Sequence, residues 1–193
     1  MPARRSRGGP HLGGFVLLCL CLPGAAFCQS DLPPAIQSEI KAHFIYTLAK
    51  FVKWPPRSFP DPGAPLSFCA LGEDPLITAL QSVVEGKTIN GRRAAFRQIA
   101  GVSDAETCQV VVVGSSEVAR LREVLHGLRG FSALTVGEAD GFTGLGGIVR
   151  LRMQETMVQS EINVPIARRA GLQISSEFLK LSGIVMVKNR GAD

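Results

Sequence analysis

The run Cys108-Gln109-Val110-Val111-Val112-Val113 constrains the fold more than any other segment of the sequence. β-branched residues favour extended strands, and successive side chains of a strand point to opposite faces of its sheet. Four consecutive valines therefore predict a strand that is buried on both faces. Such a strand needs helices on each side of its sheet, as in α/β proteins.

The segments before this strand alternate between helix and strand patterns. Apolar residues recur every three or four positions between Pro34 and Val52, which predicts an amphipathic helix with Asp31 as a possible cap. Trp54-Pro55-Pro56 should end this helix. The next predicted elements are a strand at residues 66–71, a helix from Asp74-Pro75 to about Val84, and a strand at residues 94–99.

The segments after the valine run continue this alternation. The predicted elements are a helix capped by Ser115-Ser116-Glu117 that runs to about Leu128, a strand at residues 131–136, a hairpin of residues 148–153 and 158–163, a short helix at residues 165–170, and a last helix from Ser175 or Ser176 to about Gly183. This order predicts one α/β domain whose mixed sheet has about six strands, mainly parallel in its first half, flanked by about five helices.

The first 28 residues have the three parts of a secretory signal peptide. Three arginines precede an apolar run at residues 15–22, and small residues follow at 24–26. The run is shorter than the roughly 18 residues that a membrane span needs. We therefore expect residues 1–26 to be removed, with cleavage at 26–28, and a domain at 30–190 to be exported. Losing three arginines lowers the formal net charge from +5 to +2, which gives no reason to expect a nucleic-acid partner.

Export would leave two cysteines in the folded domain, Cys69 and Cys108. An oxidising compartment favours their pairing as a disulfide. The bond would close a loop of about 40 residues and stabilise the fold by about 4 kcal/mol in the chain-entropy model. The alternative is a pair of buried thiols, because both cysteines lie in strand-like runs.

The motifs of nucleotide binding and nucleophilic catalysis are incomplete. The glycine-rich loop Gly141–Gly147 lacks the last glycine of a dinucleotide fingerprint, because Val149 stands there, and a strand pattern follows it. We interpret the loop as a tight turn that needs glycine backbone freedom. Ser115 and Ser116 follow Gly114 at a strand end, but the glycine that a nucleophile elbow requires after the serine is absent.

The titratable residues form no recognisable catalytic set. His43 and His126 each lie in a predicted helix without a second ligand at metal spacing. Glu73 and Asp74 are adjacent at a strand end, where open α/β sheets often bind ligands, although a helix cap and a solvated charge explain them as well. We therefore expect no enzyme activity and neither a bound metal nor a cofactor.

Several blocks of the sequence resemble the YfiR family, also known as DUF4154. Residues 40–55, IKAHFIYTLAKFVKWP, are similar to the family's opening helix, KAxFIYNFAKFVEWP. The later blocks are FCALGEDP at 68–75, GKTINGR at 86–92, the cysteine-led strand at 108–117, the LTV, GF and GG pieces between 134 and 147, and EIN, ARRAGL and ISS between 161 and 176. Together the blocks cover nearly the whole mature chain in order.

The resemblance implies a periplasmic regulator. Such proteins are known chiefly as inhibitory partners of an inner-membrane diguanylate cyclase, whose periplasmic sensor region they restrain so that cyclic di-GMP output falls. They are understood to be homodimers and to respond to envelope redox state or small ligands. The alternative function is a periplasmic small-molecule binding protein that signals to another membrane receptor or to a histidine kinase.

The resemblance also implies roles for particular residues. The family's disulfide falls on positions that match Cys69 and Cys108, whereas a second cysteine pair that some members carry is absent from residues 141–151. The expected partner or dimer contacts are Glu161, Asn163, Arg168, Arg169 and Trp54. Structural roles are equally open: a salt bridge between Glu161 and an arginine, a helix cap by Asn163, and packing of Trp54 at a helix end.

Overall fold

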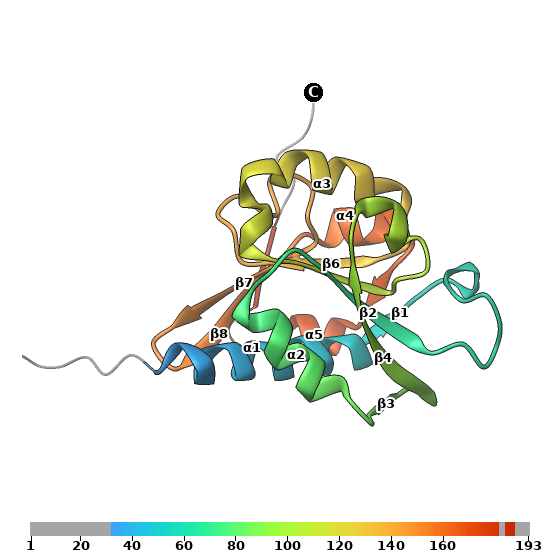
Figure 1. Ribbon diagram of the computed structural model, residues 1–193, viewed down its shortest axis with the longest axis horizontal. Helices are drawn as coiled ribbons and strands as arrows, with labels where there is room; N and C mark the ends of the chain where they lie inside the picture. The colour runs from blue at the N-terminus through green and yellow to red at the C-terminus, as the bar shows by residue number, and fades with distance from the viewer. Residues whose placement is uncertain (1–31, 182–183, 188–193) are drawn as a thin grey trace, which may run out of the picture. The chain divides into compact units, whose positions relative to one another are not determined.

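A computed structural model describes residues 32–181 and 184–187 of the chain (Figure 1). The predicted signal peptide at residues 1–26 and the possible cap Asp31 lie outside these described residues. Within them, every helix is too short or too polar to cross a membrane.

The described residues form an α/β fold around a mixed sheet of eight strands, in the order β10-β8-β7-β6-β5-β2-β4-β3. The strands are β2 (Leu66–Leu71), β3 (Thr88–Ile89), β4 (Arg92–Ile99), β5 (Val110–Val113), β6 (Leu134–Gly137), β7 (Val149–Gln154), β8 (Met157–Ile162) and β10 (Ile184–Met186). In the sheet, β4, β2, β5, β6 and β7 are successive neighbours, and each pair is parallel. Strands β7 and β8 form the predicted antiparallel hairpin, and β10 is parallel to β8. The predicted class is confirmed, and the sheet gains the short strands β3 and β10.

The strand β5 lies between β2 and β6 and is buried on both faces, as predicted. Val110 and Val112 belong to the core that includes residues of α1 (Pro34–Lys50) and α2 (Pro75–Val84). Val111 and Val113 belong to a second core with residues of α3 (Leu121–Gly127). Figure 1 accordingly shows α1 and α2 on one side of the sheet and α3 on the other.

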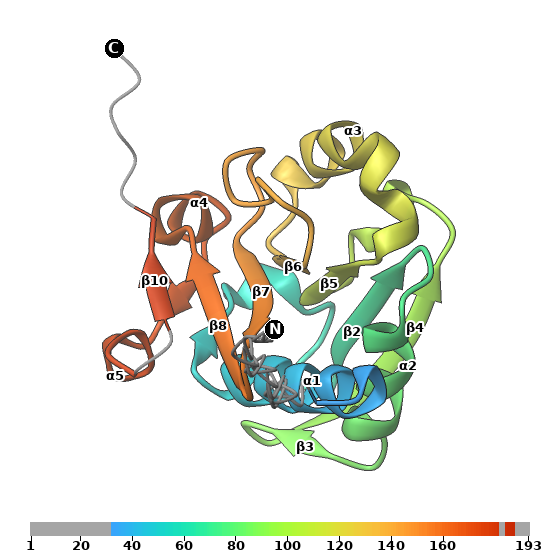
Figure 2. The same cartoon turned by 90° about the vertical axis from the view of Figure 1, so that its left-hand side faces the viewer.

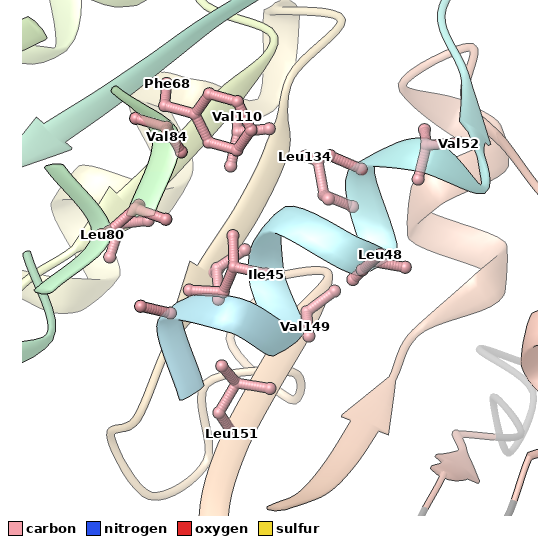
Figure 3. Packing of buried hydrophobic residues seen from close by; sticks show 14 of the residues in the cluster. Ile45, Leu48, Val52, Phe68, Leu80, Val84, Val110, Leu134, Val149 and Leu151 are labelled. Atoms are coloured by element: carbon pink, nitrogen blue, oxygen red, sulfur yellow. The ribbon is translucent and has the colours of Figure 1, made fainter. Parts of the chain in front are cut away.

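Helix α1 packs its inner face into the first core. Ala42, Ile45, Leu48 and Ala49 are fully buried on its inner face, and Figure 3 shows Ile45 and Leu48 in one cluster with side chains of β6 and β7. Lys41 on the same helix is 8% exposed and forms an ion pair with Glu138, the residue after β6. This pair fixes α1 against the carboxyl end of the parallel strands.

The carboxyl ends of β2 and β5 are joined by hydrogen bonds. Asp74 caps α2 as predicted, because its Oδ1 accepts the Leu76 N–H at 2.8 Å, while its Oδ2 accepts the Ser115 N–H at 3.1 Å. The Ser116 hydroxyl accepts the Glu73 N–H at 2.8 Å. The prediction that Ser115-Ser116-Glu117 caps an α-helix is wrong. Residues 115–120 form a 3-10 helix without a side-chain cap, because the two serine hydroxyls bond to the Glu73 backbone instead.

The remaining elements are short. Helix α4 (Val164–Arg169) is the predicted short helix, and α5 (Ser176–Leu179) is capped by the Ser175 hydroxyl but ends earlier than predicted. Phe178 of α5 packs on Phe44 and Phe51, with ring centroids 5.7 and 5.2 Å apart. The other elements are a two-stranded antiparallel sheet of β1 (Val52–Lys53) and β9 (Gln173–Ile174), and 3-10 turns at Pro56–Ser58, Val102–Ala105 and Leu128–Gly130.

The glycine-rich loop between β6 and β7 packs around one buried phenylalanine. Phe142 is fully buried, and a Cβ on Gly137 or Gly147 would overlap its ring. Gly141 and Gly146 have φ angles of +73° and +108°, as expected for turns that need glycine. The interpretation of this loop as a tight turn is confirmed, and Phe142 adds a second reason for its glycines.

We predict that Gly147→Ala lowers the free energy of unfolding by about 1–3 kcal/mol, because the new methyl group displaces the Phe142 ring. Gly144→Ala is the matched control in the same loop. The nearest atom to its new Cβ is a backbone oxygen 3.4 Å away, so its effect should stay within about 0.5 kcal/mol. Urea denaturation of both variants checks this, and equal stabilities would contradict the packing described for Phe142.

Candidate functional site

Cys69 and Cys108 form a disulfide, as predicted. Cys69 lies in β2, Cys108 lies two residues before β5, and their Cα atoms are 5.9 Å apart. Both residues are at most 2% exposed and belong to the core on the α3 side of the sheet. The bond therefore links two central strands beneath α3.

The guanidinium of Arg97 lies against this disulfide. Its Nη2 is 3.3 Å from the Cys108 Sγ and donates hydrogen bonds to the Thr107 hydroxyl at 2.9 Å and the Asp104 carbonyl at 3.1 Å. Arg97 pairs with Cys69 in the register of β2 and β4, which explains why it reaches the sulfurs.

Two residues of the EIN block, the acidic Glu161 and the amide Asn163, connect β8 to the glycine-rich loop. The Glu161 carboxylate accepts the Thr143 hydroxyl at 2.5 Å and lies 3.8 Å from the Arg150 guanidinium. The Asn163 amide donates to the Thr143 carbonyl at 3.2 Å, and its Oδ1 accepts the Ile166 N–H at 3.1 Å, which caps α4. Both residues therefore have structural roles, and the arginine beside Glu161 comes from β7.

The other expected contact residues lie in two places. Arg168 and Arg169 are exposed at the end of α4. Trp54 is partly buried, and its indole N–H donates to the Gln109 carbonyl at 2.9 Å. The segment after Trp54 nevertheless borders α4, because Pro55 and Arg57 lie 3.3 and 3.4 Å from the position of a Cβ on Gly171. The structure thus places this segment beside the end of α4, whereas Glu161 and Asn163 lie at its start.

A cavity of about 630 Å³ lies between α3, α4 and the glycine-rich loop, and we call it the α3–α4 cavity. Figure 2 shows the loop that leads into β7 between these two helices. Its polar and charged lining residues are Arg129, Thr135, Thr143, Asn163 and Arg169. Asn163 and Arg169 thus belong both to the expected contact residues and to a cavity.

The family model of YfiR/HmsC-like proteins, DUF4154, matches residues 38–183. The chain belongs to this family. The matched range contains both cysteines of the disulfide, all five expected contact residues and every side chain that lines the α3–α4 cavity except Val187. No curated protein matches the chain.

Two solved structures share the fold of this YfiR/HmsC-like chain. An ABC domain from Streptococcus pneumonia in complex with L-Trp has a TM-score of 0.51 and 12% identity, covering 77% of this chain and 60% of that one. A conserved domain protein from Vibrio cholerae O1 biovar eltor has a TM-score of 0.51 and 14% identity, covering 81% and 61%. This chain therefore spans about three fifths of either solved chain, and the likeness concerns the fold alone.

Sequence reasoning missed the residues that become neighbours only through the fold. Arg97 follows Cys69 by 28 positions, and Arg129 lies in a segment without a recognisable motif. Thr143 lies in the glycine-rich loop, whose sequence predicts only a tight turn. A basic residue in a strand beside a cysteine-bearing strand was the available signal for Arg97. His43 and His126 are exposed, and the described residues contain no group of three His, Cys, Asp or Glu that could hold a metal.

We predict that Cys69→Ala/Cys108→Ala lowers the free energy of unfolding by about 2–5 kcal/mol. The disulfide joins residues that are 39 positions apart, and the loop it closes restricts the unfolded chain. Chemical denaturation of the oxidised chain and of the double variant measures this difference. Adding a reductant should destabilise the parent chain and leave the double variant unchanged. Equal stabilities of the two chains without reductant would contradict a structural disulfide.

Proposed function

We propose that this protein is a periplasmic regulator that binds the periplasmic sensor region of an inner-membrane diguanylate cyclase and represses it. The observation that carries the proposal is the match of the YfiR/HmsC-like family over residues 38–183. In this proposal residues 1–26 are a signal peptide that directs the chain to the periplasm. The exported domain forms a homodimer, and its action lowers cyclic di-GMP without catalysis by the chain itself.

Repression in this proposal works through a shift between conformations of the cyclase. A domain outside the cytoplasm can alter cytoplasmic catalysis only by binding one conformation of a membrane-spanning partner more tightly than the other. The rigid parts of this domain suit such a role, since the disulfide and the Lys41–Glu138 pair hold its helices and central strands in place.

The proposed contact surface is centred on the end of α4. Arg168 and Arg169 are exposed there, and the segment of Trp54, Pro55 and Arg57 lies beside it. Arginine and tryptophan are enriched at protein interfaces, and exposed arginines can pair with carboxylates of a partner. Glu161 and Asn163 stabilise the segments next to this surface. Glu161 accepts a hydrogen bond from Thr143 of the glycine-rich loop, and Asn163 caps the start of α4.

A second candidate function is small-molecule binding with signalling to another membrane receptor or a histidine kinase. The α3–α4 cavity favours it, because small-molecule sites have volumes of about 300–1,000 Å³ and this cavity measures about 630 Å³. The two functions are compatible when a ligand alters the affinity for the membrane partner.

We predict that Arg168→Glu weakens binding to the periplasmic region of the cyclase at least about tenfold, because charge reversal removes a favourable pair and adds repulsion. Biolayer interferometry with the exported chain and an immobilised cyclase region measures the dissociation constant. The matched control is Arg122→Glu, which reverses an exposed arginine on α3 and should bind like the parent.

The outcomes separate the function from the surface. If the parent chain does not bind the cyclase region, the proposed regulation is wrong. If the parent binds but Arg168→Glu and Arg122→Glu have equal dissociation constants for the cyclase region, the end of α4 is not the contact surface.

A further inference from the structure

We propose that the α3–α4 cavity is a binding site for a small organic anion with an apolar body. The site lies on the α3 side of the sheet, and its lining comes from α3, β6, the glycine-rich loop and α4. The inference rests on the second candidate function, small-molecule binding in this cavity, and names the ligand class for it; it holds whichever membrane protein is the partner.

The cavity lining combines polar and apolar surface in similar amounts. The apolar part comes chiefly from Leu125, Leu128, Phe131, Ala133, Ile148 and Ile166. Four of these side chains, Leu125, Leu128, Ala133 and Ile148, are at most 3% exposed and belong to the folded core or its edge. Such walls favour a ligand whose body is a ring or a branched chain, because burying apolar surface drives its transfer from water.

The charged side chains that line the cavity are both arginines, Arg129 and Arg169. Within the described residues, neither takes part in an ion pair or a side-chain hydrogen bond of the structure. Glu161, which accepts the hydroxyl proton of the lining residue Thr143, also lies 3.8 Å from the Arg150 guanidinium. The cavity therefore presents two guanidinium groups without a carboxylate in its lining.

The guanidinium of Arg129 lies beside the glycine-rich loop. Its Nη2 and Nε atoms are 3.4 and 3.5 Å from the position that a Cβ of Gly146 would occupy, which is ordinary contact distance. Gly146 itself has a φ angle of +108°, which residues other than glycine rarely adopt. The Arg129 guanidinium is therefore placed against the loop that lines the cavity.

Two buried polar side chains add hydrogen-bonding groups to the site. Thr135 is 5% exposed, and its hydroxyl accepts the Ile148 N–H at 2.9 Å, so the hydroxyl proton remains for an acceptor in the cavity. Asn163 is 4% exposed and uses one amide hydrogen on the Thr143 carbonyl. These groups are donors, which again match an oxyanion.

The combination of features defines the ligand class. Guanidinium groups bind carboxylate, sulfonate and phosphate oxygens through charge-assisted hydrogen bonds, and their planar donors favour bidentate contact. A bare inorganic ion would leave the apolar part of the lining in contact with water, so a ligand that also has an apolar body fits the cavity better. An aromatic or branched aliphatic anion satisfies both parts of the cavity.

A pair of fluorescent probes tests this inference. Anilinonaphthalene sulfonate carries an aromatic body and one sulfonate, whereas N-phenyl-1-naphthylamine has the same body without the charge. We expect the exported chain to bind the sulfonate saturably at one site and to bind the neutral probe at least about tenfold more weakly, because the charged hydrogen bonds are missing. Fluorescence titration with each probe measures both dissociation constants.

Substitutions locate the site. Arg129→Gln/Arg169→Gln should weaken sulfonate binding at least about tenfold and leave the neutral probe within about twofold. Arg129→Lys/Arg169→Lys keeps both charges and should retain most of the affinity. The matched control is Arg93→Gln/Arg122→Gln, which removes the same charge from exposed positions outside the cavity lining and should bind both probes like the parent.

Three results would overturn the inference: equal affinities of the parent for the two probes, unchanged sulfonate binding by Arg129→Gln/Arg169→Gln, or an equal loss in the control variant. The titrations need only the purified chain. Their failure would therefore leave the proposed regulation of a cyclase standing, and a failure of cyclase binding would leave the cavity assignment standing.

Discussion

The burial of β5 on both faces is the constraint on which the rest of the structure depends. Val110 and Val112 require the cover of α1 and α2, while Val111 and Val113 require the cover of α3. Because the neighbouring strands are parallel, the chain must cross over a face of the sheet between them. Helices α2 and α3 lie in such crossovers, whereas α1 precedes β2. The same arrangement brings the loops after β2, β5 and β6 to one edge, where Asp74 and the Lys41–Glu138 pair join them to the helices.

The α3 side of the sheet carries the features that bear on function. Helix α3 has only seven residues, so it covers the disulfide and β5 but leaves Thr135 and Ile148 to face a cavity. The glycine-rich loop and α4 enclose that cavity from the other side, with Asn163 linking them. The disulfide and the cavity therefore lie on the same side of the sheet, and the exposed end of α4 borders the cavity through Arg169.

The sequence predicted the features that follow from local pattern. The valine run, the Asp74 cap, the β7–β8 hairpin and the Asn163 cap each depend on residues close together in the chain. The missed features depend on distant partners. Ser115 and Ser116 have the sequence pattern of helix caps, but their hydroxyls form hydrogen bonds with the backbone of Glu73 in another loop. Strand β10 has only three residues, which is too short for a recognisable sequence pattern. The contact of Arg97 with the disulfide, and the position of Arg129 and Arg169 around one cavity, likewise need the folded sheet.

The central claim is that this YfiR/HmsC-like chain lowers cyclic di-GMP by acting on a membrane cyclase. The most direct test is the cellular concentration of cyclic di-GMP, measured by mass spectrometry in the parent strain, a strain lacking this gene, and a strain lacking both this gene and the cyclase gene. We expect the concentration to rise in the single deletion and to return to the parent value or below in the double deletion. An unchanged concentration in the single deletion, with the cyclase retained, would contradict this claim.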